Sequence, residues 1–288
     1  MRVTTRVGCL LVGLVLAGTA RGQDAPKPLP ADVRAAWEKA GAQVGWMSSP
    51  APRSYGVSFR PGTGKGKPGE VPAFRFLRWQ AGVLAKVPAP EQAFGIVVSD
   101  TKMNYAGLSE LGRFKHLRSL SIGGMTDKGL KALAGLKQLQ SLFLNDTDVT
   151  DAGLKELAGL TQLRFLDLGG TEVTGAGLKA LAGLKELRIL ILIKAKVTEA
   201  GLKAMGGLKT LQTLNLGGTE VMDAWLKGLV LHKELRTLDL TNTPITDAGL
   251  KELAGLKQLQ SLSLEMTKVT DAGVRELQKA LPSLKIQR

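Results

Sequence analysis

The segment "LQSLFLNDTDVTDAGLKELAGLTQ" (residues 139–162) is the clearest copy of a unit that recurs along most of the chain. Its first half has the spacing Leu-x-x-Leu-x-Leu, and aligning the chain on this spacing gives eight units. They begin at Ala93, Leu117, Leu139, Leu163, Leu187, Leu211, Leu235 and Leu259, with steps of 24 residues except one of 22. Because a unit of this length cannot bury its apolar face alone, the copies must stack on one another.

Each unit divides into a short strand and a helix. In Leu-x-x-Leu-x-Leu, unit positions 4 and 6 face one side of the strand, and positions 3, 5 and 7 face the other. The following half, "TDAGLKELAGL" (150–160), spaces its leucines as an apolar helical stripe. Thr150 is suited to cap this helix and Asp151 to favour its first turn. The same pair recurs at Thr246, Asp247, Thr270 and Asp271. Alternating strands and helices predict parallel strands in a right-handed coil.

With this unit the chain resembles bacterial leucine-rich-repeat proteins with 24-residue units, of the ribonuclease-inhibitor or GALA type. The resemblance covers residues 93–288. It implies an α/β fold, a right-handed horseshoe-shaped solenoid with parallel strands on the concave face and helices on the convex face. It implies little about function, because function in this fold resides in individual surface sites.

Unit position 9 departs from the common pattern of these repeats. Asn or Cys usually stands there and ties neighbouring turns together, whereas this chain has Thr147, Thr171, Thr219, Thr243 and Thr267. A hydroxyl has one donor hydrogen where an amide has two. We therefore expect a weaker ladder between turns, and none at Ala195.

Residues 1–22 have the features of a secretory signal peptide. A basic start precedes a 14-residue apolar run, and small residues precede a cleavage site after Gly22. The run is shorter than the ~20 residues that span a bilayer, so an uncleaved membrane anchor is the weaker alternative. Cleavage would remove Cys9, the only cysteine, and leave no transmembrane segment. We expect export to the periplasm, the cell envelope or the medium.

The remaining non-repeat segments are expected to form a leader and two caps. Residues 23–30 are predicted to be a flexible leader, and residues 31–70 an N-terminal cap. The cap combines an amphipathic helix (31–42), an alternating strand "SYGVSF" (54–59) and a mobile basic loop "PGTGKGK" (61–67). Residues 71–92 fit a degenerate opening repeat with Val71, Phe74 and Phe76 in the core. The eight repeats then occupy 93–283, and residues 284–288 form a C-terminal cap strand.

The sequence contains no recognisable catalytic set. "PGTGKGK" has Gly66 where a phosphate-binding loop needs Ser or Thr, and Phe59 at its first glycine position. His116 and His232 are far apart in the sequence, and the aspartates recur once per unit as helix-start residues. We therefore expect a protein that is not an enzyme and needs no cofactor or metal.

The unit at 211–234 is irregular on its outer half. Met222 replaces the capping Thr, Trp225 replaces Gly, and His232 replaces Leu. These changes are typical of local repacking around one large ring, and a second contact surface is the alternative.

The formal net charge is +14, and part of it forms a regular row. Unit position 17 holds Lys131, Lys155, Lys179, Lys203, Lys227, Lys251 and Arg275. Such a row is either a solvated helix face or a surface that adheres to an anionic polymer or the cell envelope. Specific nucleic-acid binding is not expected, because no aromatic residues are interleaved with these cations.

Five large apolar residues interrupt the predicted concave face. Positions 3, 5 and 7 are mostly small or polar, but three consecutive units carry Phe143, Phe165, Ile189, Ile191 and Ile193. Neighbouring strands lie ~4.8 Å apart, so these side chains should touch. A polar rim is expected from Arg164, Arg188, Arg236, Asp167 and Asp239.

Three interpretations of these five residues remain open: a partner site, a surface covered by residues 43–70, or neutral variation. We favour an exported, non-catalytic scaffold that binds a protein partner through the concave face. The alternative function is electrostatic binding of an anionic polymer or envelope surface through the convex face.

Overall fold

The structure is a computed structural model that describes residues 25–48, 56–99 and 105–288. The signal peptide expected at residues 1–22 lies outside the described residues. Within the described ranges, no helix has the length and apolar character needed to cross a bilayer.

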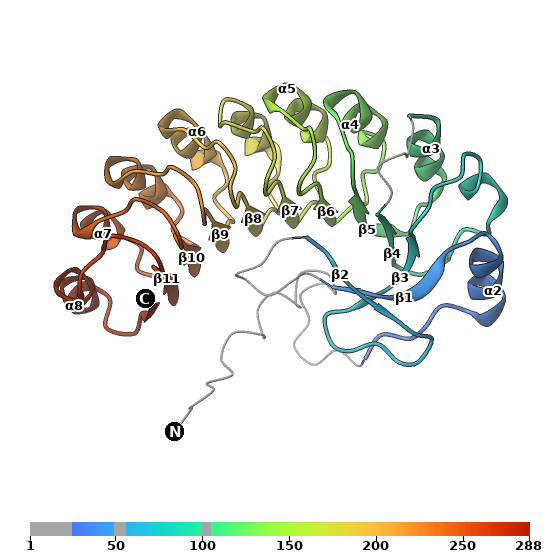
Figure 1. Ribbon diagram of the computed structural model, residues 1–288, viewed down its shortest axis with the longest axis horizontal. Helices are drawn as coiled ribbons and strands as arrows, with labels where there is room; N and C mark the ends of the chain where they lie inside the picture. The colour runs from blue at the N-terminus through green and yellow to red at the C-terminus, as the bar shows by residue number, and fades with distance from the viewer. Residues whose placement is uncertain (1–24, 49–55, 100–104) are drawn as a thin grey trace.

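The repeats form an arc with strands along its inner side and helices along its outer side (Figure 1). Within the described residues a single sheet of 12 strands follows the arc, and its strands from β3 to β12 pair in parallel with their neighbours. Their bounds are β3 Val71–Phe76, β4 Phe94–Val98, β5 Leu117–Ile122, β6 Ser141–Phe143, β7 Phe165–Asp167, β8 Ile189–Ile191, β9 Thr213–Asn215, β10 Thr237–Asp239, β11 Ser261–Ser263 and β12 Lys285–Gln287. The predicted α/β solenoid is confirmed.

Alternation along each strand separates two apolar clusters. Leu166 and Leu168, at unit positions 4 and 6, belong to the main core between the sheet and the helices. Phe165, at position 3, belongs to a separate cluster on the concave side. The predicted division of the strand into two faces is therefore confirmed.

The outer half of each turn is helical, in part as 3-10 helix (η). The segments are α3 Tyr105–Glu110, η2 Leu111–Arg113, α4 Asp127–Leu133, α5 Asp151–Leu154, η3 Lys155–Leu157, η4 Gly177–Gly183, α6 Glu199–Ala204, η5 Met205–Gly207, η6 Asp223–Leu231, α7 Asp247–Leu253 and α8 Asp271–Ala280. The predicted caps Thr150, Thr246 and Thr270 each accept a backbone N–H from their helix. Where Gly175 or Met222 disrupts the Thr-Asp pair, the segments η4 and η6 are entirely 3-10.

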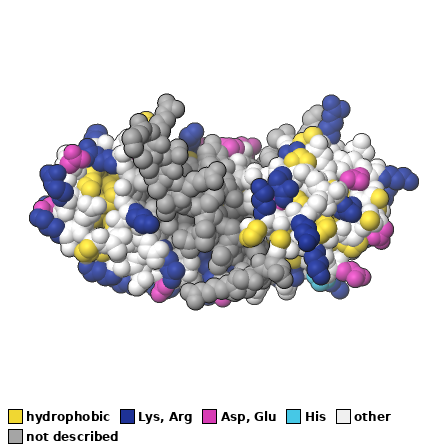
Figure 2. All heavy atoms as spheres, turned by 90° about the horizontal axis from the view of Figure 1, so that it is seen from below, with side chains coloured by type: hydrophobic (Ala, Val, Ile, Leu, Met, Phe, Trp, Pro, Cys, Tyr) yellow, Lys and Arg dark blue, Asp and Glu magenta, His cyan; other side chains and the backbone are white. Residues whose placement is uncertain are grey.

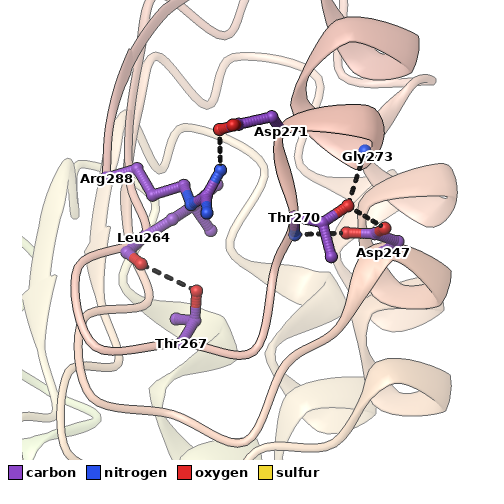
Figure 3. Close-up of polar contacts among 7 residues, drawn as sticks. All are labelled: Asp247, Leu264, Thr267, Thr270, Asp271, Gly273 and Arg288. Atoms are coloured by element: carbon purple, nitrogen blue, oxygen red, sulfur yellow. Dashed lines mark hydrogen bonds and ion pairs between the residues drawn. The ribbon is translucent and has the colours of Figure 1, made fainter.

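A carboxylate–threonine ladder joins successive turns on the outer side. Asp151 accepts hydrogen bonds from the backbone N–H of Thr174 (3.0 Å) and from its hydroxyl (2.5 Å). The same two bonds join Asp127 to Thr150, Asp223 to Thr246 and Asp247 to Thr270. Figure 3 shows the last pair, in which the Thr270 hydroxyl also accepts the N–H of Gly273. Burial opposes ionisation of Asp151, but the hydrogen bonds it accepts hold its pKa below the usual value.

The threonines at unit position 9 do not tie the turns together, so that prediction was wrong. The hydroxyl of Thr171 donates to the carbonyl of Leu168 in its own turn, at 2.6 Å. Thr147, Thr219, Thr243 and Thr267 make the equivalent bond, which Figure 3 shows for Thr267 and Leu264. The single hydroxyl hydrogen is used locally, and the carboxylate of the neighbouring turn makes the link instead.

The ladder is interrupted in the middle of the arc. Gly175 and Glu199 stand where the neighbouring turns have Asp, and Met222 stands where they have Thr. In the described part of the chain, the link from Thr174 to Thr198 is a backbone bond of 2.7 Å, with Gly175 packed directly against Gly201. The interruption spans the three turns that start at Leu163, Leu187 and Leu211, and the middle one carries Ile189, Ile191 and Ile193.

The N-terminal cap is a helix and a hairpin. In α2 (Ala31–Lys39), Trp37 stacks on Phe74 with ring centroids 3.9 Å apart. β1 (Gln43–Ser48) pairs antiparallel with β3, and β2 (Ser58–Pro61) pairs antiparallel with β1. Figure 1 shows both strands lying across the open side of the arc. The expected strand at 54–59 begins at Ser58, and residues 49–55 lie outside the described part.

The expected leader and basic loop are packed rather than free. Leu29 is buried in the main core, and the carbonyl of Pro26 accepts the N–H of Gly66. Gly62 donates to the carbonyl of Val44, and Lys67 donates its backbone N–H to the Glu70 carboxylate. The basic loop at 61–67 is therefore held in place by hydrogen bonds of its backbone N–H groups. Its composition, from which mobility was predicted, does not indicate these bonds.

The opening repeat consists of β3 and the short η1 (Leu84–Lys86). Phe74 and Phe76 lie in the main core as predicted. Val71 does not, because it lies on the opposite face of the strand and joins the concave cluster.

The ladder predicts a difference between two acidic residues at equivalent positions. Asp151→Ala should lower the free energy of unfolding by about 1–2 kcal/mol, because Thr174 loses a charged acceptor. Glu199→Ala should change it by less than about 0.5 kcal/mol, because no side-chain bond of the ladder is present there. Chemical denaturation of the two variants measures both values, and equal losses would contradict a structural role for the ladder.

Candidate functional site

The five apolar side chains predicted on the concave wall are buried. Phe143 and Phe165 are 1% exposed, Ile189 and Ile191 3%, and Ile193 8%. They form one cluster that is distinct from the main core. Neutral variation does not explain a shared cluster, because each member is removed from water by the others and by a cover.

The strand register brings these residues together as expected. Phe165 on β7 is the direct partner of Ile189 on β8, and Ile191 is the partner of Asp167. The rings of Phe143 and Phe165 lie with centroids 4.6 Å apart. The predicted contact across three strands is therefore confirmed.

The cover comes from the chain's own N-terminal hairpin. Met47 from β1 is fully buried in the cluster, and Val57 and Phe59 pack against it. Val71, Ala73 and Val97, from β3 and β4, complete the cluster. Of the three interpretations, the structure supports cover by residues 43–70. The five apolar side chains are therefore not exposed on the concave wall. Burial of side chains of this size contributes ~1.5–3 kcal/mol each, which explains why the hairpin lies there.

Sequence reasoning named the covering segment, residues 43–70, as one open interpretation but did not identify the individual residues that cover the cluster. Met47, Val57 and Phe59 lie more than 80 positions before the repeats that they cover, so no periodicity connects them. One signal was present: the alternation in "SYGVSF" places Val57 and Phe59 on the same side of an extended segment.

Asp167 is the polar member of this site. It is fully buried, and its Oδ2 accepts the backbone N–H of Gly56 at 2.6 Å. Its Oδ1 accepts the N–H of Gly169 at 2.9 Å. Asn215 and Asp239 make the same local bond, to Gly217 and Thr241. One carboxylate oxygen of Asp167 therefore accepts a backbone N–H at the end of its own strand. The other accepts a backbone N–H of the hairpin segment.

Burial raises the pKa of Asp167 to about 6. The N–H groups of Gly56 and Gly169 act in the opposite direction, and the nearby charge of Asp146 adds to the rise. Loss of hydration outweighs the two hydrogen bonds, as is usual for a carboxyl enclosed by apolar side chains.

The predicted polar rim is only partly assembled. Arg164 and Arg188 both lie near the Glu186 carboxylate, at 4.0 and 3.9 Å. Arg236 precedes β10, and Asp239 lies on it, so β9 separates both from the apolar cluster. Asp239 is buried and accepts the amide of Asn215. Of the ten predicted site residues, the structure brings the five apolar ones and Asp167 into one site.

Comparison with known sequences supports the repeat assignment. A family described as Leucine Rich repeat matches residues 160–182 and 233–254. The chain is a leucine-rich-repeat protein. Among curated proteins, no sequence matches it.

Two solved structures from Listeria monocytogenes str. 4b F2365 are similar to this leucine-rich-repeat protein. Internalin C2 is 26% identical with a TM-score of 0.48, over 64% of this chain and 73% of that one. An internalin designated inlF is 23% identical with a TM-score of 0.49, over 68% of this chain and 59% of that one. The fold assignment itself rests on the repeat geometry and the family match.

The irregular outer half of the repeat at 211–234 is packed into the protein. His232 is fully buried, with Nδ1 3.0 Å from the carbonyl oxygen of Leu208, and burial lowers its pKa. Trp225 packs against the main core, whereas Met222 is 52% exposed. His232 and Trp225 therefore support local repacking rather than a second contact surface.

The basic row lies on the surface as expected. The seven cations at unit position 17, Lys131, Lys155, Lys179, Lys203, Lys227, Lys251 and Arg275, are all exposed. On the side of the molecule opposite to the helices, Lys and Arg side chains also occupy both ends of the arc, with fewer Asp and Glu (Figure 2). Among the residues that the structure describes, no group of three His, Cys, Asp or Glu is placed to bind a metal.

The buried cluster predicts that Ile191 is a stabilising residue of this leucine-rich-repeat protein. Ile191→Ala should lower the free energy of unfolding by about 2–4 kcal/mol, as expected for a buried side chain. Ser261→Ala, at a partly exposed position of the same wall, should change it by less than about 0.5 kcal/mol. Denaturant titration tests both, and a near-zero effect of Ile191→Ala would show that the cluster is open in solution.

The site also predicts a pH dependence. The folded-state pKa of Asp167 exceeds its usual 3.8, so the stability contributed by its neutral form is full below pH 4 and is lost as the pH rises through about 6. The lowered pKa of His232 acts oppositely, since its contribution is present above pH 6.5 and falls as the pH drops. Carboxyl NMR titration separates the two effects, and a pKa of Asp167 at or below 3.8 would contradict its burial.

Proposed function

We propose that this leucine-rich-repeat protein is an exported, non-catalytic scaffold that binds a protein partner through its concave face. The observation that carries the proposal is the curved inner wall of the repeats, which stays partly exposed in the turns of β10 and β11. The concave face of such a solenoid forms an extended binding surface. The apolar cluster of Phe143, Phe165, Ile189, Ile191 and Ile193 is covered by the hairpin and does not itself offer this surface.

The wall beyond the cluster offers further contact area. Thr237 and Thr241 from the turn of β10, and Ser261 and Glu265 from the turn of β11, are partly exposed. A stable interface buries ~800 Å² on each partner, so we expect the partner to extend over several turns of this C-terminal part. Export is inferred from the basic and apolar pattern of residues 1–22.

Affinity capture from an envelope extract of the source organism tests the proposal. Thr237→Arg/Ser261→Arg places two long charged side chains on the partly exposed wall. It should reduce recovery of the partner at least about tenfold, which corresponds to ~1.4 kcal/mol of binding free energy. The melting temperature should stay near that of the wild type, because neither side chain is in the core.

Ala152→Arg/Ala248→Arg is the matched control, because both alanines are exposed on the outer helices. This variant should capture the partner as the wild type does. Equal recovery with the wall variant would overturn binding through the concave face. Recovery that also falls steeply with salt would then favour an anionic polymer bound by the exposed Lys row.

A further inference from the structure

We infer that one lateral side of the arc is a binding surface for an anionic lipid bilayer. This surface, the basic side, consists of the seven corners of the chain that precede β5 to β11. It is separate from the concave wall, so the inference does not depend on the proposed function. The corners are residues 115–118, 137–140, 161–164, 185–188, 209–212, 233–236 and 257–260.

The fold places all seven corners on the same side of the arc. The strands pair along the arc, and their two faces point to the concave cluster and to the main core. Each strand therefore runs from one lateral side to the other. The strands from β5 to β11 are parallel and in register, so the corners before them share one side. Figure 1 views the whole arc down the shortest axis of the molecule, so this side is one of its broad faces.

The net charge of the chain is concentrated on the basic side. The seven corners contain ten Lys or Arg and two Glu, which gives +8 of the formal +14, and each corner is net positive. The four residues that follow each of these strands or its last residue, on the opposite side, contain three Lys and five acids: 123–126, 145–148, 169–172, 193–196, 217–220, 241–244 and 265–268.

The outer helices do not share this excess of positive charge. The helical segments α4, α5, η3, η4, α6, η5, η6, α7 and α8 together contain nine Lys or Arg and nine Asp or Glu. The Lys row at unit position 17 is therefore balanced by acids on the same helices. An anionic surface is attracted to the lateral side rather than to the convex side.

Lysines at unit position 23 are the exposed cations of the basic side. All six are exposed, and within the described part of the chain none of them forms an ion pair: Lys115, Lys137, Lys185, Lys209, Lys233 and Lys257. Neighbouring strands lie ~4.8 Å apart, which is less than the Debye length of ~8 Å at physiological ionic strength. The potentials of neighbouring corners therefore add, and they extend over a broad face.

The arginines of these corners already have partners in the protein. Arg118 donates to two backbone carbonyls of its own corner, at 2.8 and 3.3 Å. Arg164 and Arg188 lie 4.0 and 3.9 Å from the Glu186 carboxylate. A single carboxylate or phosphate is typically recognised by a bidentate arginine, whereas lysine is a mobile point charge. The basic side therefore suits a diffuse layer of lipid headgroups better than one defined anionic group.

An exposed leucine lies at the edge of the basic side. Leu231 is 47% exposed and precedes the corner 233–236 by one residue. An apolar side chain beside lysines is suited to the boundary between headgroups and acyl chains, whereas a soluble polyanion offers it no apolar contact. The seven corners contain no aromatic residue on which nucleic-acid bases could stack. Equivalent positions in five other turns have glycine: Gly135, Gly159, Gly183, Gly207 and Gly255.

Acetylation footprinting of the full chain tests the inference one lysine at a time. The probe is a vesicle of mixed phosphatidylcholine and phosphatidylglycerol. Lys209, Lys233 and Lys257 should react at least about fivefold more slowly on it than in solution, the factor that corresponds to ~1 kcal/mol per cation near anionic lipid. Reading each lysine separately keeps the result independent of attachment through residues 1–22, which are themselves basic and apolar.

The internal controls are the outer-helix lysines of the same three turns, Lys203, Lys227 and Lys251. Their reaction rates should change by less than about twofold, because screening limits the effect of the bilayer to the side that contacts it. Vesicles of phosphatidylcholine alone should protect neither set. Equal protection of both sets, or equal protection by both kinds of vesicle, would overturn the inference.

Two triple variants remove the same charge from two different faces. Lys209→Gln/Lys233→Gln/Lys257→Gln should weaken binding by the basic side about 100-fold, at about fivefold per lysine, and so remove the protection of Lys115 and Lys137. Lys203→Gln/Lys227→Gln/Lys251→Gln should retain that protection. All six lysines are exposed, so both melting temperatures should stay near that of the wild type. Equal loss of protection in the two variants would show an effect of net charge alone and contradict a basic side.

Leu231→Gly distinguishes a bilayer from a soluble polyanion. This variant restores the residue that the other turns have, and it should lower the protection of Lys209 and Lys233 on mixed vesicles. With poly-L-glutamate as the probe, the variant and the wild type should be protected equally. An equal effect of Leu231→Gly on both probes, or stronger protection by poly-L-glutamate than by the vesicles, would assign the basic side to a soluble polyanion and overturn the bilayer as its partner.

Discussion

Each turn of the solenoid buries its leucines only against the turns before and after it, and the rest of the structure depends on this constraint. Leu166 and Leu168 have the same task as their equivalents in every other turn, so these positions show little variation. The inner wall and the outer helices do not share that task. The features that distinguish one turn from another, including the apolar cluster and the basic row, therefore lie on these two faces.

The repeat pattern accounts for how much of the fold could be predicted. A 24-residue period determines which side of each strand a residue occupies, and stacking then determines its neighbours on adjacent strands. Bonds between turns were not predictable in the same way. Thr171 and Thr174 are three positions apart and carry the same hydroxyl group. Only the folded structure shows that Thr174 bonds to Asp151 of the preceding turn, whereas Thr171 bonds within its own turn.

The candidate site was predictable to the same extent. The prediction of its surroundings failed for a related reason. The mutual contact of Phe165, Ile189 and Ile191 follows from register alone. Their cover does not, because the hairpin is not a repeat, and its position depends on how β1 folds back onto β3. Asp167 was expected on the polar rim of the site, but it is buried beside the hairpin. This burial raises its pKa.

The bond from Gly56 to Asp167 joins residues 111 positions apart, whereas stacked repeats otherwise touch only their neighbours. Open arrays of repeats fray from their ends and lose turns piecemeal. Here the hairpin joins the first turns to β7 through this bond, so we expect fraying of the N-terminal end to be coupled to the middle of the arc. In this same part of the arc the Asp–Thr ladder is interrupted at Gly175 and Glu199, and among the described residues a backbone bond from Thr198 to Thr174 takes its place between the turns of β7 and β8. We therefore expect the turns up to β7 to open together, whereas the turns after β9 are held only by their neighbours.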